Sequence, residues 1–155
     1  MLILGSSSVA RKELLGSVGL VPSKIEAPGI DENLKVGEKP ENYVKRIALD
    51  KANSISADKR CFLITADTIV TVGRRVLLKT FDEIEAAEYL RVLAGRRHKV
   101  LTAFCVKHNG IVSLNLVKTS LKMRLLTEKE INVYIASGEW EGSAGGYSIQ
   151  GKAKS

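Results

Sequence analysis

The sequence predicts an α/β fold, because short apolar segments of strand length alternate with amphipathic segments of helix length. Residues 2–4 form a short apolar strand, and residues 61–66 are an apolar run of the kind that forms a strand covered on both faces. Between them, residues 40–53 carry apolar side chains at helical spacing. The chain has 155 residues, of which 45% are hydrophobic and 26% charged, so we expect one globular domain with a sizeable core.

The chain begins with a predicted strand, a small-residue loop and a helix. Residues 2–4 form the strand, residues 5–8 (Gly-Ser-Ser-Ser) interrupt it, and residues 9–15 form a helix with Leu14 and Leu15 facing inward. This arrangement points backbone N–H groups and the positive end of a helix at an anion. Many α/β proteins begin in this way, so the signal is weak when taken alone.

A helix is predicted over residues 40–53, after an extended or looped segment at residues 21–34. Pro40 suits its first turn, and one side of the helix is apolar. That side consists of Tyr43, Val44, Ile47, Ala48 and Ala52. Lys51 lies near the end of the helix, where the helix dipole also favours a cation.

The feature that indicates chemistry is Asp67, which follows the strand predicted over residues 61–66. A carboxylate at the mouth of a buried strand is stable only if it is solvated, paired or bound to a metal. Lys51 and Lys79 are candidate cations near it, in a chain of net charge +7. An acid with lysines around it predicts a site for a phosphate-bearing substrate and a divalent cation. The alternative is that Asp67 only caps a turn with Thr68.

Two hairpins, two helices and a glycine-rich loop are predicted for the rest of the chain. The hairpins are predicted over residues 68–72 with 76–79 and over residues 100–107 with 111–125. The helices are predicted over residues 82–95 and 128–137, and the glycine-rich loop covers residues 143–151. The Asn109-Gly110 pair is a strong signal for a two-residue hairpin turn. Thr127 and Glu130 have the spacing of a helix capping box.

Composition excludes several classes of protein. The net charge of +7 favours anionic partners, but only 5% of residues are aromatic, which disfavours a platform for stacking nucleic acid bases. No apolar run is long enough to span a membrane, and the first residues lack the pattern of a signal peptide, so we expect a cytoplasmic protein. Cys61 and Cys105 lack metal-ligand spacing and are expected in the core.

Several segments, taken in order, resemble one family. They are residues 4–15 (Leu-Gly-Ser-Ser-Ser-Val-Ala-Arg-Lys-Glu-Leu-Leu), Ile30-Asp31-Glu32, Ala48 with Lys51-Ala52, Ala66-Asp67-Thr68, Lys79, Leu93-Ala94-Gly95 with His98, Val100 and Thr102, and residues 144–151 (Ala-Gly-Gly-Tyr-Ser-Ile-Gln-Gly). In this order and spacing, from Leu2 to Gly151, the chain resembles the Maf family of nucleoside triphosphate pyrophosphatases. The resemblance implies a mixed, strongly twisted central sheet flanked by helices, similar to the inosine triphosphatases, in a single domain over residues 1–155. It also implies a substrate cleft between two lobes, a cytoplasmic location and a homodimer.

The resemblance implies hydrolysis of a nucleoside triphosphate to a nucleoside monophosphate and pyrophosphate, with Mg²⁺ or Mn²⁺. The ending Tyr-x-Ile-Gln-Gly at residues 147–151 is similar to the branch that acts on dTTP and UTP, so these or modified pyrimidine nucleotides are the expected substrates. The implied roles are Asp67 as base or metal anchor, Glu32 as metal ligand, Lys51, Lys79 and Arg11 as phosphate clamps, Ser6 and Ser8 as phosphate hydrogen-bond donors, and Gln150 as reader of the pyrimidine edge. Each residue also has a structural alternative: the serines can satisfy loop backbone, Lys51 can complement a helix end, and Lys79 can occupy a strand edge.

The chain departs from the family pattern in four places. The usual Ser-Pro-Arg-Arg is Ser-Val-Ala-Arg at residues 8–11, the usual Asp-Lys is Gly-Ser at residues 142–143, and the usual Gly-Lys-Pro is Leu-Lys-Thr at residues 78–80. Family members also continue into a further strand and helix, which we expect this chain to lack. These departures leave open a catalytically impaired Maf remnant that binds nucleotides or a protein partner. A nucleic-acid-binding module is supported by net charge alone.

Overall fold

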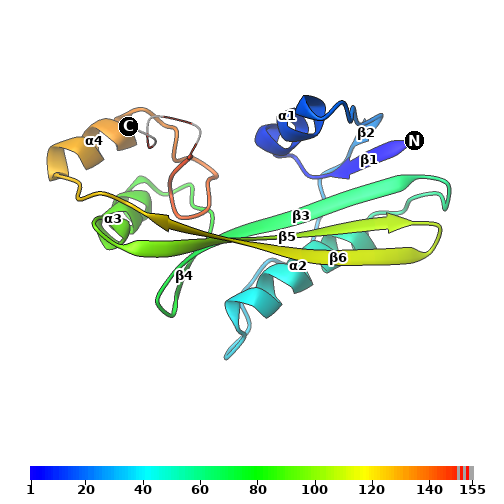
Figure 1. Cartoon of the computed structure of the whole chain (residues 1–155), viewed down its shortest axis with the longest axis horizontal. Helices are drawn as coiled ribbons and strands as arrows, with labels where there is room; N and C mark the ends of the chain where they lie inside the picture. The colour runs from blue at the N-terminus through cyan, green and yellow to red at the C-terminus, as the bar shows by residue number, and fades with distance from the viewer. Residues whose placement is uncertain (150, 152, 154–155) are drawn as a thin grey trace. The chain divides into compact units, whose positions relative to one another are not determined.

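The computed structural model describes residues 1–149, 151 and 153 and confirms a mixed α/β fold. The strands form one sheet in the order β2-β1-β3-β5-β6, with β4 paired to β3 (Figure 1). The elements are β1 (Leu2–Gly5), α1 (Val9–Ser17), β2 (Lys24–Ile25), α2 (Pro40–Ser54), β3 (Phe62–Val72), β4 (Arg75–Leu77), α3 (Glu83–Leu93), β5 (Arg97–His108), β6 (Ile111–Lys122) and α4 (Glu128–Ala136). Because β1 runs parallel to β2 and β3 while β4 runs antiparallel to β3, the sheet is mixed.

The chain divides into two compact units, and three strands contribute residues to both. Unit 1 comprises Met1–Asp67 and Thr102–Val117, and unit 2 comprises Thr68–Leu101 and Lys118–Ser155. Within the described residues, no helix combines the length and the apolar character needed to cross a bilayer.

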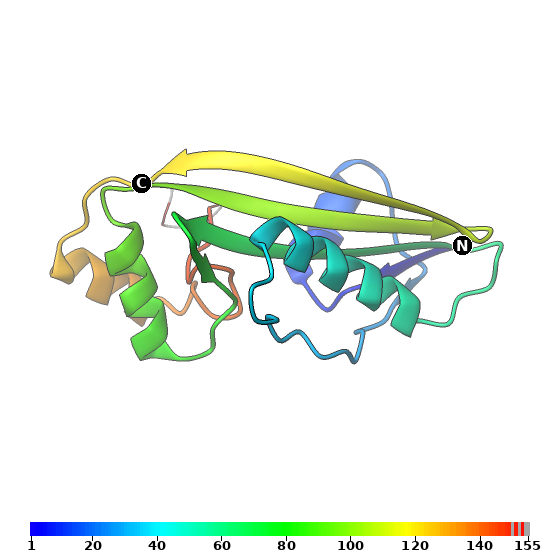
Figure 2. The same cartoon turned by 90° about the horizontal axis from the view of Figure 1, so that it is seen from below.

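In unit 1, α1 and α2 lie on opposite faces of the sheet (Figures 1 and 2). The predicted apolar side of α2 is confirmed, since Tyr43, Val44, Ile47, Ala48 and Ala52 are all buried. The Thr65 hydroxyl donates a hydrogen bond of 2.7 Å to the Ala48 carbonyl, which ties β3 to α2. Gly5 permits close packing at the end of β1, because a Cβ atom there would lie 2.7 Å from the Ile55 side chain.

The prediction that Leu14 faces inward is wrong. Its side chain is 67% exposed, and no residue of α1 is buried. The apolar pattern of a short helix shows which side chains could be covered, but it does not show whether another element covers them.

The prediction that the strand ends before Asp67 is also wrong. β3 continues through Asp67 as a single strand of 11 residues, so the carboxylate lies within the strand and is only 2% exposed. The strand can continue because the charge of Asp67 is compensated by a cation, Lys51, at hydrogen-bonding distance.

In unit 2, α3 and α4 pack against each other beside the ends of the long strands. Their shared core contains Val70, Leu90, Tyr134 and Trp140. The glycine-rich segment after α4 packs closely on this core. Gly145 has φ +71°, and a Cβ atom there would lie 2.8 Å from the Val70 side chain, so this position requires glycine.

The other predicted elements are confirmed with small differences in their ends. The hairpin turn between β5 and β6 has positive φ at both Asn109 and Gly110, as a type I′ turn requires. Thr127 and Glu130 form the predicted capping box at the start of α4. Cys61 and Cys105 are buried and free.

Candidate functional site

The polar centre of unit 1 is an ammonium shared by two carboxylates. Lys51 Nζ lies 2.9 Å from Asp67 Oδ1 and 3.0 Å from Glu32 Oε1. The Lys51 and Asp67 side chains are almost fully buried, whereas the Glu32 side chain is 43% exposed. We call these three residues, together with Ser6 and Arg11, the Lys51 cluster.

The secondary structure explains why Lys51 and Asp67 meet. Lys51 follows Ile47 by four residues on α2, so the two side chains share the buried side of the helix. Asp67 follows Thr65 by two residues on β3, so both point to the same face of the sheet. The hydrogen bond from Thr65 to Ala48 shows that this face is the one covered by α2.

Glu32 is held near this pair by the loop that precedes α2. The Tyr43 hydroxyl on α2 donates a hydrogen bond of 2.7 Å to the Glu32 carbonyl, which fixes the backbone of that loop. Burial, with the charges of Asp67 and Glu32, raises the pKa of Tyr43 to about 12. The helical spacing of Tyr43 predicts only a place in the core and carries no signal for this second role.

The first loop and α1 add a guanidinium to the cluster. Arg11 Nη1 donates to Ser6 Oγ at 3.0 Å, and Ser6 Oγ also accepts from the Ser8 backbone N–H at 3.2 Å. Ser8 Oγ accepts from the Arg11 backbone N–H at 3.4 Å and so caps α1. Burial lowers the pKa of Arg11, while the negative charges of Asp67 and Glu32 act to raise it. The guanidinium therefore interacts electrostatically with both carboxylates.

This arrangement can hold a polyanion and a divalent cation. Within the described residues, no three His, Cys, Asp or Glu side chains lie close enough together to bind a metal ion. Glu32 and Asp67 offer two carboxylates on one ammonium, and Mg²⁺ is commonly bound by one or two carboxylates with water and phosphate oxygens as the remaining ligands. The donor set therefore fits Mg²⁺ or Mn²⁺ when a phosphate-bearing ligand completes the coordination.

The remaining predicted site residues belong to unit 2. Lys79 pairs with Ala144 of the glycine-rich loop through an isolated β-bridge. Backbone hydrogen bonds from Gly145 to Leu78 (3.2 Å) and from Gly142 to Thr80 (3.0 Å) strengthen this pairing. The structure thus brings Lys79 and the loop together, and Gln150 lies outside the described residues.

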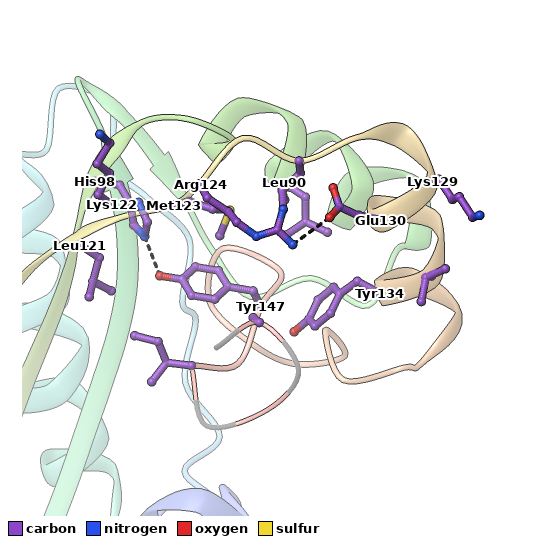
Figure 3. Close-up of a pocket in the computed structure, with 14 residues that line it drawn as sticks. Leu90, His98, Leu121, Lys122, Met123, Arg124, Lys129, Glu130, Tyr134 and Tyr147 are labelled. Atoms are coloured by element: carbon purple, nitrogen blue, oxygen red, sulfur yellow. Dashed lines mark hydrogen bonds and ion pairs between the residues drawn. The ribbon is translucent and has the colours of Figure 1, made fainter. Parts of the chain in front are cut away.

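A buried contact between His98 and Tyr147 was not predicted from the sequence. Both residues are buried, and Tyr147 Oη lies 2.6 Å from His98 Nε2 (Figure 3). Burial lowers the pKa of His98 and raises that of Tyr147 to about 12. His98 Nδ1 faces the Arg96 carbonyl oxygen at 3.5 Å, and because a carbonyl can only accept, this contact favours the tautomer in which Nε2 accepts from the Tyr147 hydroxyl. The residues are 49 positions apart in the chain, which is why no local pattern links them.

The fold and the Lys51 cluster define an α/β protein with a polar centre in which two carboxylates share a buried ammonium. More specifically, the chain belongs to the Maf family, because the sequence model described as "Maf-like protein" matches residues 1–155. The family predicted from the sequence is therefore confirmed.

Individual relatives agree with this assignment. A protein of Cereibacter sphaeroides named "dTTP/UTP pyrophosphatase" is 47% identical over 98% of this chain and 79% of its own length. A protein of Anaplasma phagocytophilum named "Nucleoside triphosphate pyrophosphatase" is 45% identical over 98% of this chain and 80% of its own length. Among solved structures, a HAM1 protein from Coxiella burnetii aligns with a TM-score of 0.46 and 8% identity, over 79% of this chain and 72% of its own.

Proposed function

We propose that this chain hydrolyses nucleoside triphosphates between the α- and β-phosphates, releasing a nucleoside monophosphate and pyrophosphate. The observation that carries the proposal is the Lys51 cluster. In it the buried Lys51 ammonium lies within 3.0 Å of a carboxylate oxygen of Asp67 and of one of Glu32, and the Arg11 guanidinium interacts with both carboxylates. The relatives named dTTP/UTP pyrophosphatase are 42–47% identical to this chain, which supports dTTP and UTP as substrates.

The reaction needs positive charge on the phosphates. As electrons move to the leaving pyrophosphate, negative charge grows on its oxygens, and cations fixed in place stabilise that charge. Lys51 and Arg11 supply cationic groups from unit 1, and Ser6 supplies a hydroxyl that can donate to a phosphate oxygen. We assign Lys79 as a third cation and Gln150 as the group that reads the pyrimidine edge.

Asp67 and Glu32 would hold the divalent cation, which when bound neutralises phosphate charge and makes water more acidic. A water oxygen attacks the α-phosphorus, the bond to the bridging oxygen breaks, and pyrophosphate leaves with that oxygen. Asp67 accepts the proton of the attacking water or anchors the metal. A bound phosphate chain would also compete for Lys51, freeing carboxylate oxygens that the ammonium holds in this structure.

Three further expectations complete the proposal. We assign the chain to a single Maf-like domain, to the cytoplasm and to a homodimeric state.

The family's second arginine is replaced by Ala10, which removes one charge-assisted contact of about 1.5–3 kcal/mol if it reaches a phosphate. We therefore expect weaker substrate binding than in relatives that retain it.

The test is pyrophosphate release from a panel of canonical and modified nucleoside triphosphates with Mg²⁺ or Mn²⁺. We expect turnover of dTTP and UTP that Asp67→Asn abolishes with a modest loss of nucleotide binding. Asp50→Asn is the matched control, because Asp50 precedes Lys51 on α2 but is 44% exposed and pairs with Arg46. Near-normal rates in Asp67→Asn would refute the assigned role.

The alternative is a catalytically impaired family member that binds nucleotides without cleaving them. Its support is the set of substitutions at Ala10 and Ser143. Nucleotide binding by calorimetry, without pyrophosphate release from the folded protein, would favour this alternative.

A further inference from the structure

Residues 31–38, which we call the Glu32 loop, carry Glu32 to the Lys51 cluster without any buried side chain of their own. The two apolar side chains of the loop, Leu34 and Val36, are exposed, and none of its residues is buried. Apolar burial therefore does not fix the position of this loop. An exposed loop without apolar contacts opens at a low cost in free energy unless polar contacts hold it.

Arg46 on α2 supplies several of the polar contacts that hold the Glu32 loop. Its Nη2 donates to the Asn33 carbonyl at 3.1 Å, and its Nε and Nη2 donate to the two carboxylate oxygens of Glu38 at 2.7 Å and 2.8 Å. One guanidinium thus binds the loop near both of its ends. The Arg46 and Glu38 side chains are only 20% and 11% exposed, so solvent screens this bidentate pair less than it screens a surface pair.

The second half of the loop is a turn that presents Glu38 to this guanidinium. The Glu38 N–H donates to the Lys35 carbonyl at 3.0 Å, and Gly37 has φ +73°, as the third position of a type II turn requires. Glu38 Oε2 also accepts from the Lys35 N–H at 3.2 Å. The hydrogen bonds from Arg46 lower the pKa of Glu38 to about 2, so this carboxylate is charged at neutral pH. The turn and the guanidinium therefore form one connected network.

Tyr43 joins this network at the first half of the loop. The Tyr43 hydroxyl donates to the Glu32 carbonyl, and Arg46 donates to the next carbonyl, that of Asn33. The guanidinium carbon of Arg46 lies 5.5 Å from the centre of the Tyr43 ring, within the range of a cation–π contact. Two side chains of α2 therefore fix two consecutive carbonyl groups, and they hold the backbone of Glu32 where its carboxylate reaches Lys51.

We propose that Arg46 is a positioning residue for Glu32. By binding the Asn33 carbonyl and the Glu38 carboxylate, Arg46 sets where the Glu32 carboxylate lies for the divalent cation. This role rests on the proposed function, in which Glu32 binds that cation, whereas the attachment of the loop to α2 does not. Lysine cannot replace Arg46, because an ammonium lacks the planar fork that binds two carboxylate oxygens at once.

Hydrogen–deuterium exchange tests the attachment of the loop without metal, nucleotide or turnover. Arg46→Leu should speed exchange of the amides of residues 33–38 by about fivefold or more and leave β3 unchanged. Tyr43→Phe keeps the ring and removes the hydroxyl, so it should have a smaller effect in the same direction. Asp50→Asn is the matched control, because Asp50 meets Arg46 at 3.5 Å but lies on α2 outside the loop. Unchanged loop exchange in Arg46→Leu would overturn the proposal.

Binding of Mn²⁺ tests whether the loop matters for the cation. Mn²⁺ is titrated by electron paramagnetic resonance into the chain saturated with a UTP analogue, in which a methylene group replaces the oxygen between the α- and β-phosphates and prevents cleavage. Arg46→Leu and Glu32→Gln should each weaken Mn²⁺ binding by about tenfold. The double variant should bind Mn²⁺ no more weakly than the weaker single variant, because Arg46 acts through Glu32. Arg46→Lys should bind as weakly as Arg46→Leu, and Asp50→Asn as tightly as the unsubstituted chain.

The outcomes separate this role from the proposed reaction. Faster loop exchange with unchanged Mn²⁺ affinity, or losses that multiply in the double variant, would overturn the positioning role and leave the proposed hydrolysis intact. No Mn²⁺ binding by the unsubstituted chain would overturn both. Far-ultraviolet circular dichroism confirms that each variant is folded.

Discussion

Replacing Lys51 with methionine tests whether the buried ammonium holds the Lys51 cluster together. The substitution keeps an unbranched side chain of similar length but removes the charge that Asp67 and Glu32 share. Asp67, only 2% exposed, would then be an unpaired carboxylate inside unit 1. Glu32 is 43% exposed at its side chain and can turn to solvent instead.

The size of the effect follows from this difference in burial. Removing one partner of a buried ion pair costs about 3–5 kcal/mol, because the other charge remains desolvated. The exposed Glu32 contact contributes at most about 1 kcal/mol. We therefore expect Lys51→Met to lower the free energy of unfolding by about 3–5 kcal/mol. Adding Asp67→Leu should restore much of that loss, with a coupling energy of about 2 kcal/mol or more.

Urea denaturation followed by circular dichroism measures these quantities. Arg60→Met is the matched control, since Arg60 is 91% exposed in its pair with Asp58 and should change stability by less than about 0.5 kcal/mol. A loss below about 1 kcal/mol in Lys51→Met, or strictly additive effects in the double variant, would refute the reasoning.

Three further predictions concern unit 2. Gly145→Ala should lower the free energy of unfolding by about 2–4 kcal/mol, because it combines a left-handed backbone with a steric overlap, whereas Gly29→Ala, with open space around it, should have little effect in the same denaturation assay. Thr127→Ala should cost about 1 kcal/mol by removing the capping box of α4, and an unchanged denaturation midpoint would contradict this. Burial lowers the pKa of His98 below 6.5, so as the pH falls below 6.5 the unfolded chain takes up a proton that folded His98 resists, and stability is lost. His98→Gln should reduce that loss in thermal melts between pH 7 and pH 5, and an identical pH dependence in the variant would exclude His98 as its source.

Much of the fold was predictable because its signals are local. The apolar side of α2, the Asn109-Gly110 turn and the Thr127 cap each depend on residues within a few positions of one another. The continuation of β3 through Asp67 was not predictable in this way. It depends on a lysine 16 positions away that compensates the charge, and propensity alone places a boundary at a charged residue.

The candidate site, like the fold, was predictable only in part. The pairing of Asp67 with Lys51 was expected from charge, and the resemblance to the family supplied Glu32, Arg11 and Ser6. The role of Tyr43 in fixing the loop of Glu32 depends on a side-chain contact that no spacing rule contains. The contact between His98 and Tyr147 was not predictable for a related reason, since the two residues are 49 positions apart in the chain.

The most direct test of the proposed reaction is to follow the oxygen atom of water. Hydrolysis of dTTP is carried out with Mg²⁺ in water labelled with heavy oxygen, and the products are weighed by mass spectrometry. Attack at the α-phosphorus predicts that the label appears in dTMP and that pyrophosphate is unlabelled. Label in inorganic phosphate or in pyrophosphate, or no turnover by the folded protein, would contradict the account.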